Sequence, residues 1–467
     1  MVDGVIIPVN GCSCITIDFW GRTHLNVLAA FLTHAHADHV QGLNTSWNGQ
    51  IPIYCSYATS RLIRERFPGV QSPVIILSED TTELLSLASP LGTVNVHVKA
   101  YNANHCLGSL MLLFEGPFGR ILHTGDFRWE ADYAAVMLRD EGLTWAPLDK
   151  LYIDNTYAHP RYDFPPRAEA CRAVLDIVRS HADKAILIGI DKLGKEELLA
   201  AVAAASGERV CVPAERWALL EMLGLPAARL FTTDTQAARI HAVLRHSVTM
   251  KQVALLNRRR PTIAILPSGF SFYNSGAKAS ILQSVAVGRA SAYVGPVSPV
   301  ELEQASHLVF QVPYSLHCNF SELRSFVAAL RPRQLIATVS HGVEADIDVG
   351  LEQLCSQASL QYACMPGSES AQAAKACLQQ RKPSPLAAVS VQADCSRVLK
   401  EGNQSTAALS TLPAAEWQQQ GVVGSAPDAL GTGQTELIGN GACHGQSSWQ
   451  ALYWNLCALR SQTQRTT

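Results

Sequence analysis

The chain has 467 residues, which is about three domains by length, and its 37 Lys and Arg residues almost balance its 39 Asp and Glu residues. Because 48% of the residues are hydrophobic and 16% are charged, the chain can bury a sizeable core, which excludes collagen-like and wholly disordered proteins. The balanced charge argues against bulk electrostatic coating of nucleic acid but permits a local basic groove. No apolar run could cross a bilayer and the first residues lack a signal-peptide pattern, so no membrane association is expected.

The thirteen cysteines are an odd number, scattered along the chain without a CxxC pair. This pattern matches neither a disulfide framework nor a zinc finger. We therefore expect reduced, mostly buried thiols in an intracellular protein.

The first 157 residues predict short strands joined by loops, with one helix at 57–67. The predicted strands are 15–20, 29–33, 51–56, 94–100, 110–115, 120–123 and 151–153. From about 160 to 299, helices alternate with apolar strands. The predicted helices are 167–181, 196–205 and 215–223, and the strands are 185–190, 209–212 and 262–267. This alternation predicts an α/β domain with a mainly parallel sheet.

Strand character resumes at 307–313, followed by a helix at 321–330 and a strand at 334–339. Asn319 stands three residues before Glu322, which predicts an N-cap with a capping-box partner. Beyond about 366 periodicity fades, and the composition predicts a poorly ordered tail. The apolar island at 449–459 could be a short helix that binds a protein partner, although a fortuitous amphipathic stretch fits equally well.

Four metal-capable side chains lie within six residues in Thr33-His34-Ala35-His36-Ala37-Asp38-His39, directly after an apolar strand. Neutral imidazole nitrogens bind Zn²⁺ at about 2.0–2.1 Å, and a carboxylate in the cluster suits a second, harder cation. The alternative is a loop with several surface histidines, but such loops seldom have HxHxDH spacing at a strand end. The pattern therefore predicts a metal site.

This string is the signature of the metallo-β-lactamase fold, which the rest of the chain also resembles. Over about residues 4–345 the chain is similar to the β-CASP branch, and within it to the Apollo–Artemis family of DNA cross-link repair nucleases, nearest to the 5′-exonuclease type. The matching strings are Asp126-Phe127-Arg128, Leu151-Tyr152-Ile153-Asp154-Asn155-Thr156, Lys192-Leu193-Gly194-Lys195-Glu196, Asn102-Ala103-Asn104-His105, Pro313-Tyr314-Ser315-Leu316-His317 and Ser321-Glu322-Leu323-Arg324.

The resemblance implies an α/β fold class: a metallo-β-lactamase αββα sandwich with an inserted β-CASP α/β domain and a disordered C-terminal tail. We expect residues 1–158 to form the first part of the lactamase domain and 159–305 to form the β-CASP domain. Residues 306–365 would be the return segment of the lactamase domain, and 366–467 the low-complexity tail.

The resemblance also implies two zinc sites. His34, His36, His105 and Asp126 would hold a tightly bound zinc. Asp38, His39 and the bridging Asp126 would hold a second zinc. Asp18 would support the histidine loop as a hydrogen-bond acceptor. His97 and His123 are expected to be satisfied core histidines within strands.

The implied catalytic residues are Asp38, Asp154 and His317. Asp154 would keep the His317 imidazole charged, so that it acts as a general acid next to the leaving oxygen; the alternative is a core histidine before a helix. Val339 occupies the position where RNA-cleaving members carry a metal-binding histidine and members acting on DNA carry valine. The second metal should then bind more weakly, unless His341 substitutes as its ligand.

DNA-processing members of the family grip a 5′-terminal phosphate. The matching substrate-binding positions are Ser315, Ser268, Gly269 and Lys195. Asp191-Lys192 and Cys318-Asn319 depart from the family pattern, which weakens this match unless Lys192 or Lys195 neutralises Asp191. The basic run Arg258-Arg259-Arg260 could line the path of the DNA backbone, but a solvated charged loop is the more common role of such a run.

The resemblance implies a nuclear, zinc-dependent 5′→3′ DNA exonuclease that acts on 5′-phosphorylated ends in cross-link repair, double-strand break repair or telomere processing. The expected partners are single-stranded DNA or duplex ends and a protein bound by the tail. Alternatives are an endonuclease of the Artemis type, a β-CASP RNA endonuclease and a non-catalytic repair scaffold.

Overall fold

The computed structural model describes residues 4–269 except 46, 48, 80 and 224–226, together with 283–284, 304–340, 350, 353–354 and 361–363. All of these described residues belong to one compact unit. The predicted tail, its apolar island and His341 lie outside the described residues. Among the described helices, none is long and apolar enough to cross a membrane.

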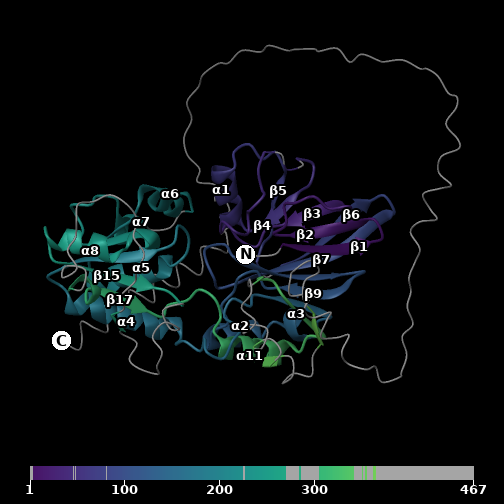
Figure 1. Cartoon of the computed structure of the whole chain (residues 1–467). Coiled ribbons are helices and arrows are strands. Elements are labelled where there is room, and N and C mark those ends of the chain that lie inside the picture. Colours follow the sequence, from purple (N-terminus) through teal and green to yellow (C-terminus); the bar gives the residue numbers. More distant parts are fainter. Residues whose placement is uncertain are drawn as a thin grey trace, which may run out of the picture. The chain divides into compact units, whose positions relative to one another are not determined.

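The first sheet has five strands, which are labelled β1 to β5 in Figure 1. Its strands, in spatial order, are β1 (Val5–Asn10), β2 (Ser13–Ile17), β3 (Asn26–Phe31), β4 (Ile53–Cys55) and β5 (Val74–Ile76). β1 and β2 are antiparallel, whereas β2 to β5 are mutually parallel. The HxHxDH loop follows the carboxyl end of β3.

The second sheet joins strands from both ends of the described chain. Its seven strands run in the spatial order β19 (Gln361–Ala363), β18 (Gln334–Ala337), β10 (Lys150–Ile153), β9 (Gly119–His123), β8 (Leu110–Gly116), β7 (Gly92–Asn102) and β6 (Thr82–Ser89). β9, β10 and β18 are parallel, so their carboxyl ends share one edge. Asp126, Asp154 and Val339 follow these three ends.

These two sheets pack face to face with helices outside them. Val5, Ile17, Phe31, Val98 and Phe114 belong to the apolar core between the sheets. On the outer face of the first sheet lies α1 (Tyr57–Arg66), whose Ile63 packs with Leu32 and Ile53. The helices that share a core with the outer face of the second sheet are α2 (Ala131–Met137), α3 (Glu141–Thr144) and α11 (Phe320–Leu330). The predicted αββα sandwich is therefore confirmed.

The third sheet, which we call the inserted sheet, lies in the chain between β10 and β18. Its spatial order is β13 (Phe231–Thr232), β12 (Val210–Cys211), β14 (Ile240–Leu244), β11 (Ala185–Ile190), β15 (Thr262–Pro267), β17 (Val309–Val312) and β16 (Gln283–Ser284). Every described pairing in it is parallel except β16 with β17, as the alternation of helices and strands predicts.

Helices cover both faces of the inserted sheet because its strands are apolar on both sides. Ile186 and Ile188 of β11 pack with α4 (Arg167–Ser180), α5 (Glu196–Ser206) and α6 (Ala214–Met222). Ala264 and Leu266 of β15 face the opposite core, which includes α8 (Met250–Asn257). The short α7 (Ala227–Leu230) and the 3-10 turn η1 (Arg245–Ser247) complete the described elements of this part.

The structure moves one expected boundary. The strand expected to open the return segment, β17, pairs with β15 in the inserted sheet. Leu316 belongs to the core of the inserted sheet, and Cys318 belongs to the core of the second sheet. We therefore place the return of the chain at about residue 317 rather than 306, as a proposal for the domain boundary. The predicted capping box of α11 is confirmed, because Asn319 and Glu322 each accept from the other's backbone N–H.

Candidate active site

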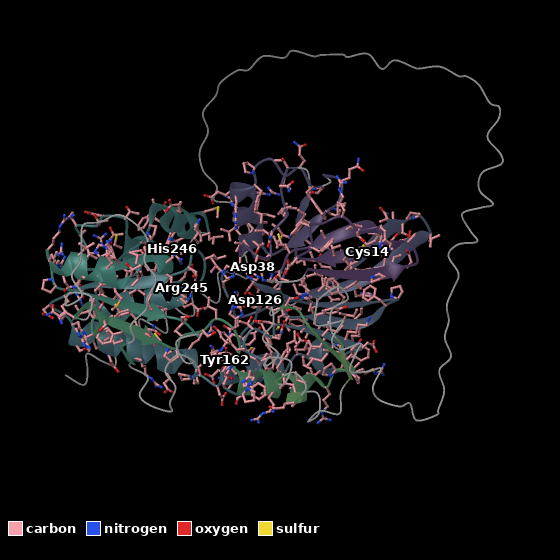
Figure 2. All side chains as sticks on the ribbon, viewed as in Figure 1. Cys14, Asp38, Asp126, Tyr162, Arg245 and His246 are labelled. Carbon is pink, nitrogen blue, oxygen red and sulfur yellow. The ribbon has the colours of Figure 1, made fainter. Side chains whose placement is uncertain are left out.

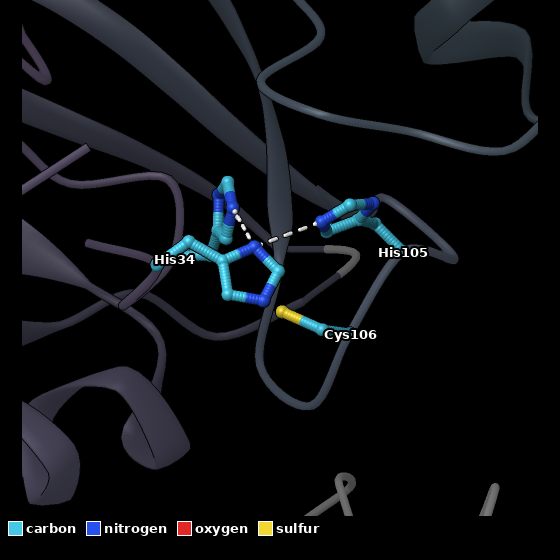
Figure 3. Close-up of side chains that lie close together, drawn as sticks. His34, His105 and Cys106 are labelled. Carbon is cyan, nitrogen blue, oxygen red and sulfur yellow. Dashed lines mark hydrogen bonds between the residues drawn. The ribbon is translucent and has the colours of Figure 1, made fainter. Parts of the chain in front are cut away.

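Three histidines from two separate loops converge on one point. His34 Nε2 lies 2.9 Å from His36 Nδ1, and His105 Nε2 lies 3.1 Å from the same His36 atom. Figure 3 shows His34 and His105 facing this point from different parts of the chain. The carboxylate of Asp126 completes the group, since its Oδ2 lies 3.5 Å from His34 Nε2 and 3.6 Å from His105 Nε2. The structure thus brings together the four residues expected to hold the first metal.

The separations given above, 2.9–3.6 Å, approach those of a tetrahedral zinc site, where ligand atoms about 2.0–2.1 Å from the metal are about 3.3–3.4 Å from one another. Among the described residues, His36 and Asp126 belong to different groups of metal-capable atoms that lie within 4.8 Å of one another. Burial and the neighbouring imidazoles lower the pKa of His34 and of His105 well below the usual histidine value. Both rings are therefore neutral, which is the form that binds a metal. These residues fit a metal ion.

The outer nitrogen of each ring has its own partner. His36 Nε2 lies 3.2 Å from the carbonyl oxygen of Leu193, and His105 Nδ1 lies 3.1 Å from that of Leu316. A carbonyl can only accept, so it fixes the proton on the outer nitrogen and leaves the inner nitrogen free for a metal. Both carbonyls belong to loops that follow strands of the inserted sheet, β11 and β17. The inserted segment therefore sets the tautomers of two rings in the lactamase-like site.

His39 occupies a second position, on the other side of Asp126. Its Nε2 lies 3.3 Å from Asp126 Oδ1, is buried, and makes no well-formed hydrogen bond. Its Nδ1 lies 2.7 Å from Asp18 Oδ2. Burial opposes the charged ring, but Asp126 and Asp18 outweigh it and raise the pKa of His39 well above its usual value. The two carboxylates thus favour a positive charge here, which a second metal would supply.

Asp18 has the supporting position expected of it. Its carboxylate accepts from the Thr33 N–H at 2.8 Å and from the Thr33 hydroxyl at 2.6 Å, besides contacting His39. Asp18 has a positive φ of 52°, an uncommon conformation for a residue with a side chain. These bonds tie the end of β2 to the start of the metal-binding loop.

Asp38 does not join the cluster. Its side chain is exposed, and the described groups of metal-capable atoms contain His39 and Asp126 but not Asp38. The physical reason is that an isolated carboxylate keeps its hydration unless a cation compensates its burial. Asp38 is near enough to favour the charged form of His36, so its role as a ligand stays a prediction.

His317 and Asp154 form the expected pair beside the metal-binding group. His317 Nδ1 lies 2.7 Å from Asp154 Oδ2, and its Nε2 lies 4.0 Å from Asp126 Oδ2. Burial favours the neutral ring, but the carboxylates of Asp154 and Asp126 outweigh it and raise the pKa of His317 to about 9. His317 is therefore an imidazolium at neutral pH in the metal-free protein, with a proton available on the side that faces Asp126.

Substituting Asp154→Asn is expected to lower the pKa of His317 in the metal-free protein. The raised pKa means that the charged ring stabilises the fold fully below about pH 6.5, and this contribution is lost as pH rises through about 9. The substitution removes most of that pH dependence. An NMR titration of the histidine ring in chelator-treated protein measures it. His123, whose pKa burial lowers to about 4, should show no titration above pH 6 in either protein. An unchanged His317 titration would contradict the pairing.

Two of the four expected substrate-binding residues lie together near His317. The Ser315 hydroxyl accepts from the His317 N–H at 3.0 Å and donates to its carbonyl. A Cβ atom on Gly269 would lie 3.0 Å from Ser315 Cβ and 2.6 Å from the Tyr157 hydroxyl, so only glycine fits there. The ring of Tyr157 is 6.0 Å from that of His317. Ser268 directly precedes Gly269, and its N–H donates to Val312.

Lys195 pairs with Asp191, which is one of the alternatives that the sequence left open. Its ammonium lies 2.8 Å from Asp191 Oδ2 and its side chain is 7% exposed. It therefore neutralises Asp191, one of the two departures from the family pattern. Burial opposes ionisation, but Lys195 and Arg245 outweigh it and lower the pKa of Asp191. Direct contact between Lys195 and a substrate stays a prediction.

Arg128, for which no role is predicted from the sequence, holds the His317 loop in place. Its guanidinium is fully buried and donates to the Ser315 carbonyl at 2.7 Å. It also pairs with Glu322 of the capping box at 2.8 Å. Its position two residues after Asp126, in a string that matches the family, is the sequence signal for this role. Cys106 is a second residue without a predicted role, and its sulfur lies among the metal-capable atoms of His34, His36 and His105 (Figure 3).

The remaining histidines and the basic run have structural explanations. His123 is buried and its Nδ1 accepts from Gly125, as expected of a core histidine. The same expectation for His97 is wrong, because the alternation of β7 turns this side chain to solvent. Arg259 and its two arginine neighbours precede the amino end of β15, whereas Ser268 follows its carboxyl end. The run is exposed at the sheet edge opposite the site, which favours a solvated loop.

Comparisons with known proteins agree with this fold. A beta-lactamase superfamily domain model matches residues 22–212, and a DNA repair metallo-beta-lactamase model matches 227–343. The 5′ exonuclease Apollo of Rattus norvegicus is 34% identical over 340 residues, covering 72% of this chain and 55% of the relative. Apollo of Gallus gallus is 34% identical over 339 residues, covering 72% and 64%. The DNA cross-link repair protein SNM1 of Arabidopsis thaliana is 30% identical over 326 residues, covering 67% and 61%.

The fold and the histidine–aspartate cluster define a metallo-β-lactamase protein with a site built for metal. The chain belongs to the DNA repair metallo-β-lactamase family that includes Apollo and SNM1. It spans between about half and two thirds of the length of the relatives named above, 55% to 64%.

Proposed function

We propose that this protein is a zinc-dependent 5′→3′ DNA exonuclease that acts on 5′-phosphorylated ends. The observation that carries the proposal is the convergence of His34, His36, His105 and Asp126 directly beside the His317–Asp154 pair. The relatives called 5′ exonuclease Apollo support the direction of digestion. The name of the DNA cross-link repair protein SNM1 and the DNA repair model support work on cross-linked DNA. Action in the nucleus, on double-strand breaks or on chromosome ends is part of the same proposal.

The metal supplies, when bound, an activated water and charge stabilisation for an in-line phosphoryl displacement. One oxygen of Asp126 faces His34 and the other faces His39. Asp126 would therefore be a ligand shared by the two metal sites. His317 donates a proton from Nε2 to the leaving oxygen, while Asp154 orients the ring through Nδ1. Asp154 is itself fixed, because its other oxygen accepts from the Thr156 N–H and hydroxyl.

The second metal should bind more weakly than the first. Val339 follows β18, next to the end of β10, and its backbone pairs with the Asn155 side chain at 2.8 and 3.0 Å. Its isopropyl side chain provides no donor at the position where RNA-cleaving members have a histidine. With Asp38 turned to solvent, His39 and Asp126 are the donors that the described structure assembles there. This difference favours DNA as the substrate over RNA.

The proposed activity is tested with 3′-labelled strands, which keep their label as the 5′ end is removed. Purified protein should shorten 5′-phosphorylated single-stranded DNA from its 5′ end, chelator should stop the reaction, and added zinc should restore it. The same strand with a 5′-hydroxyl should be degraded more slowly. Preference for RNA would indicate the RNA endonuclease, and cutting of circular strands or closed hairpins would indicate the Artemis type. If zinc-loaded protein cleaves no strand, the remaining hypothesis is a non-catalytic repair scaffold that acts through a protein bound by the tail.

A further inference from the structure

The carboxyl edge of the inserted sheet carries side chains from four neighbouring strands. In parallel α/β sheets this edge is where ligands bind. In spatial order, Arg245 follows β14, Asp191 follows β11, Ser268 follows β15 and Ser315 lies beyond β17. The register pairs Ile190 with Leu244, so Asp191 and Arg245 directly continue adjacent strands. The strand order therefore places Arg245 and Asp191 on the same sheet edge as the two serines, beside the candidate metal site.

Arg245 is exposed yet held in place. Its Nε lies 3.5 Å from Asp191 Oδ1, while Lys195 takes the other oxygen of Asp191 at 2.8 Å. The Arg245 side chain is 51% exposed and that of Lys195 is 7% exposed, so Arg245 is the cation of this group that a ligand can reach. Figure 2 marks Arg245 on the inserted segment and Asp126 in the lactamase-like part.

The loop that carries Asp191 is braced against the metal-binding residues. Buried Arg216 donates to the carbonyls of Gly194 and Asp191 and pairs with Glu196. Leu193 contacts His36, as described above. Arg245 and His36 both help to lower the pKa of Asp191. Arg245 also opposes the rise that burial causes in the pKa of Tyr157, beside Gly269. The charge of Arg245 therefore acts on the Asp191 loop and on the residues near His317.

We propose that Arg245 binds a phosphate of the DNA strand, and that Asp191 orients its guanidinium for this contact. The proposal rests on the proposed nuclease function. One carboxylate between two cations leaves a net charge of +1, which favours a phosphate oxygen. A guanidinium fixed at Nε still presents its terminal N–H donors, which suit a phosphate.

The test compares Arg245→Gln with Arg245→Lys, Arg259→Gln and Arg209→Gln. Arg209 is a matched control, since it is exposed at the amino end of β12. Arg245→Gln should raise KM for 5′-phosphorylated single-stranded DNA about tenfold with kcat nearly unchanged, because a charge-assisted contact to the strand is lost. On a nuclease-resistant phosphorothioate strand, the slope of log binding constant against log salt should fall by about 0.7, the value of one phosphate contact. Arg245→Lys should restore most of the slope.

Each outcome decides the proposal. An unchanged KM and salt slope in Arg245→Gln would overturn it and leave Arg245 as a surface ion pair. A reduced slope in Arg259→Gln with none in Arg245→Gln would also overturn it and assign the strand to the opposite edge. If the unsubstituted protein cleaves no DNA, the proposed nuclease function fails, whereas an active protein insensitive to Arg245→Gln refutes this inference alone.

Discussion

Substituting Asp126→Asn is expected to reduce nuclease activity about a thousandfold and to lower the bound metal in the same preparation. The Asp126 side chain is 7% exposed and its two oxygens face His34 and His39 separately. An amide of the same size presents N–H donors to one of those rings, where a metal needs an oxygen ligand. Loss of Lewis-acid stabilisation worth several kcal/mol accounts for the size of the effect.

Elemental analysis and strand digestion on the same sample measure both effects. Asp132→Asn, an exposed aspartate in the first turn of α2, is the matched control and should keep full metal and rate. Thermal unfolding of both proteins in chelator separates misfolding from metal loss, because only a folding defect lowers the metal-free melting temperature. Full metal content together with full activity in Asp126→Asn would refute this assignment of the site.

Substituting His317→Gln is expected to slow digestion by about 10²–10⁴-fold while the bound metal stays at its original level. The ring is not among the four donors of the first site, and its pKa of about 9 makes it a proton donor at neutral pH. The loss should be much smaller on a nitrophenyl phosphodiester, because that leaving group departs without a proton.

The comparison of the two substrates distinguishes a proton donor from a structural residue. His97→Gln replaces an exposed histidine on β7 and should leave both reactions unchanged. An equal loss on both substrates would show that His317 does not deliver the proton. Loss of metal in His317→Gln would instead assign His317 to the metal site, in line with its place in the His105–Asp126 group of metal-capable atoms.

Part of the candidate metal site could be predicted from a local pattern, since three histidines within six positions after a strand have few other uses. His105 and Asp126 lie far along the chain from that pattern, and their assignment came from the family resemblance. The capping box of α11 is local too, since Asn319 and Glu322 are neighbours on the first turn. Short or polar elements were missed, among them β6, α2 and α8, because their stability comes from packing rather than from a clear period.

The sequence determined which side chains carry the chemistry and which strand ends present them. The tertiary structure alone decided that Leu193 and Leu316 accept from His36 and His105, and that buried Arg128 holds the His317 loop. It also placed β17 in the inserted sheet and Arg245 beside Asp191. The partners are 157 positions apart in the His36–Leu193 hydrogen bond and 211 positions apart in the His105–Leu316 hydrogen bond. Such contacts depend on how whole sheets pack, and no local sequence pattern encodes them.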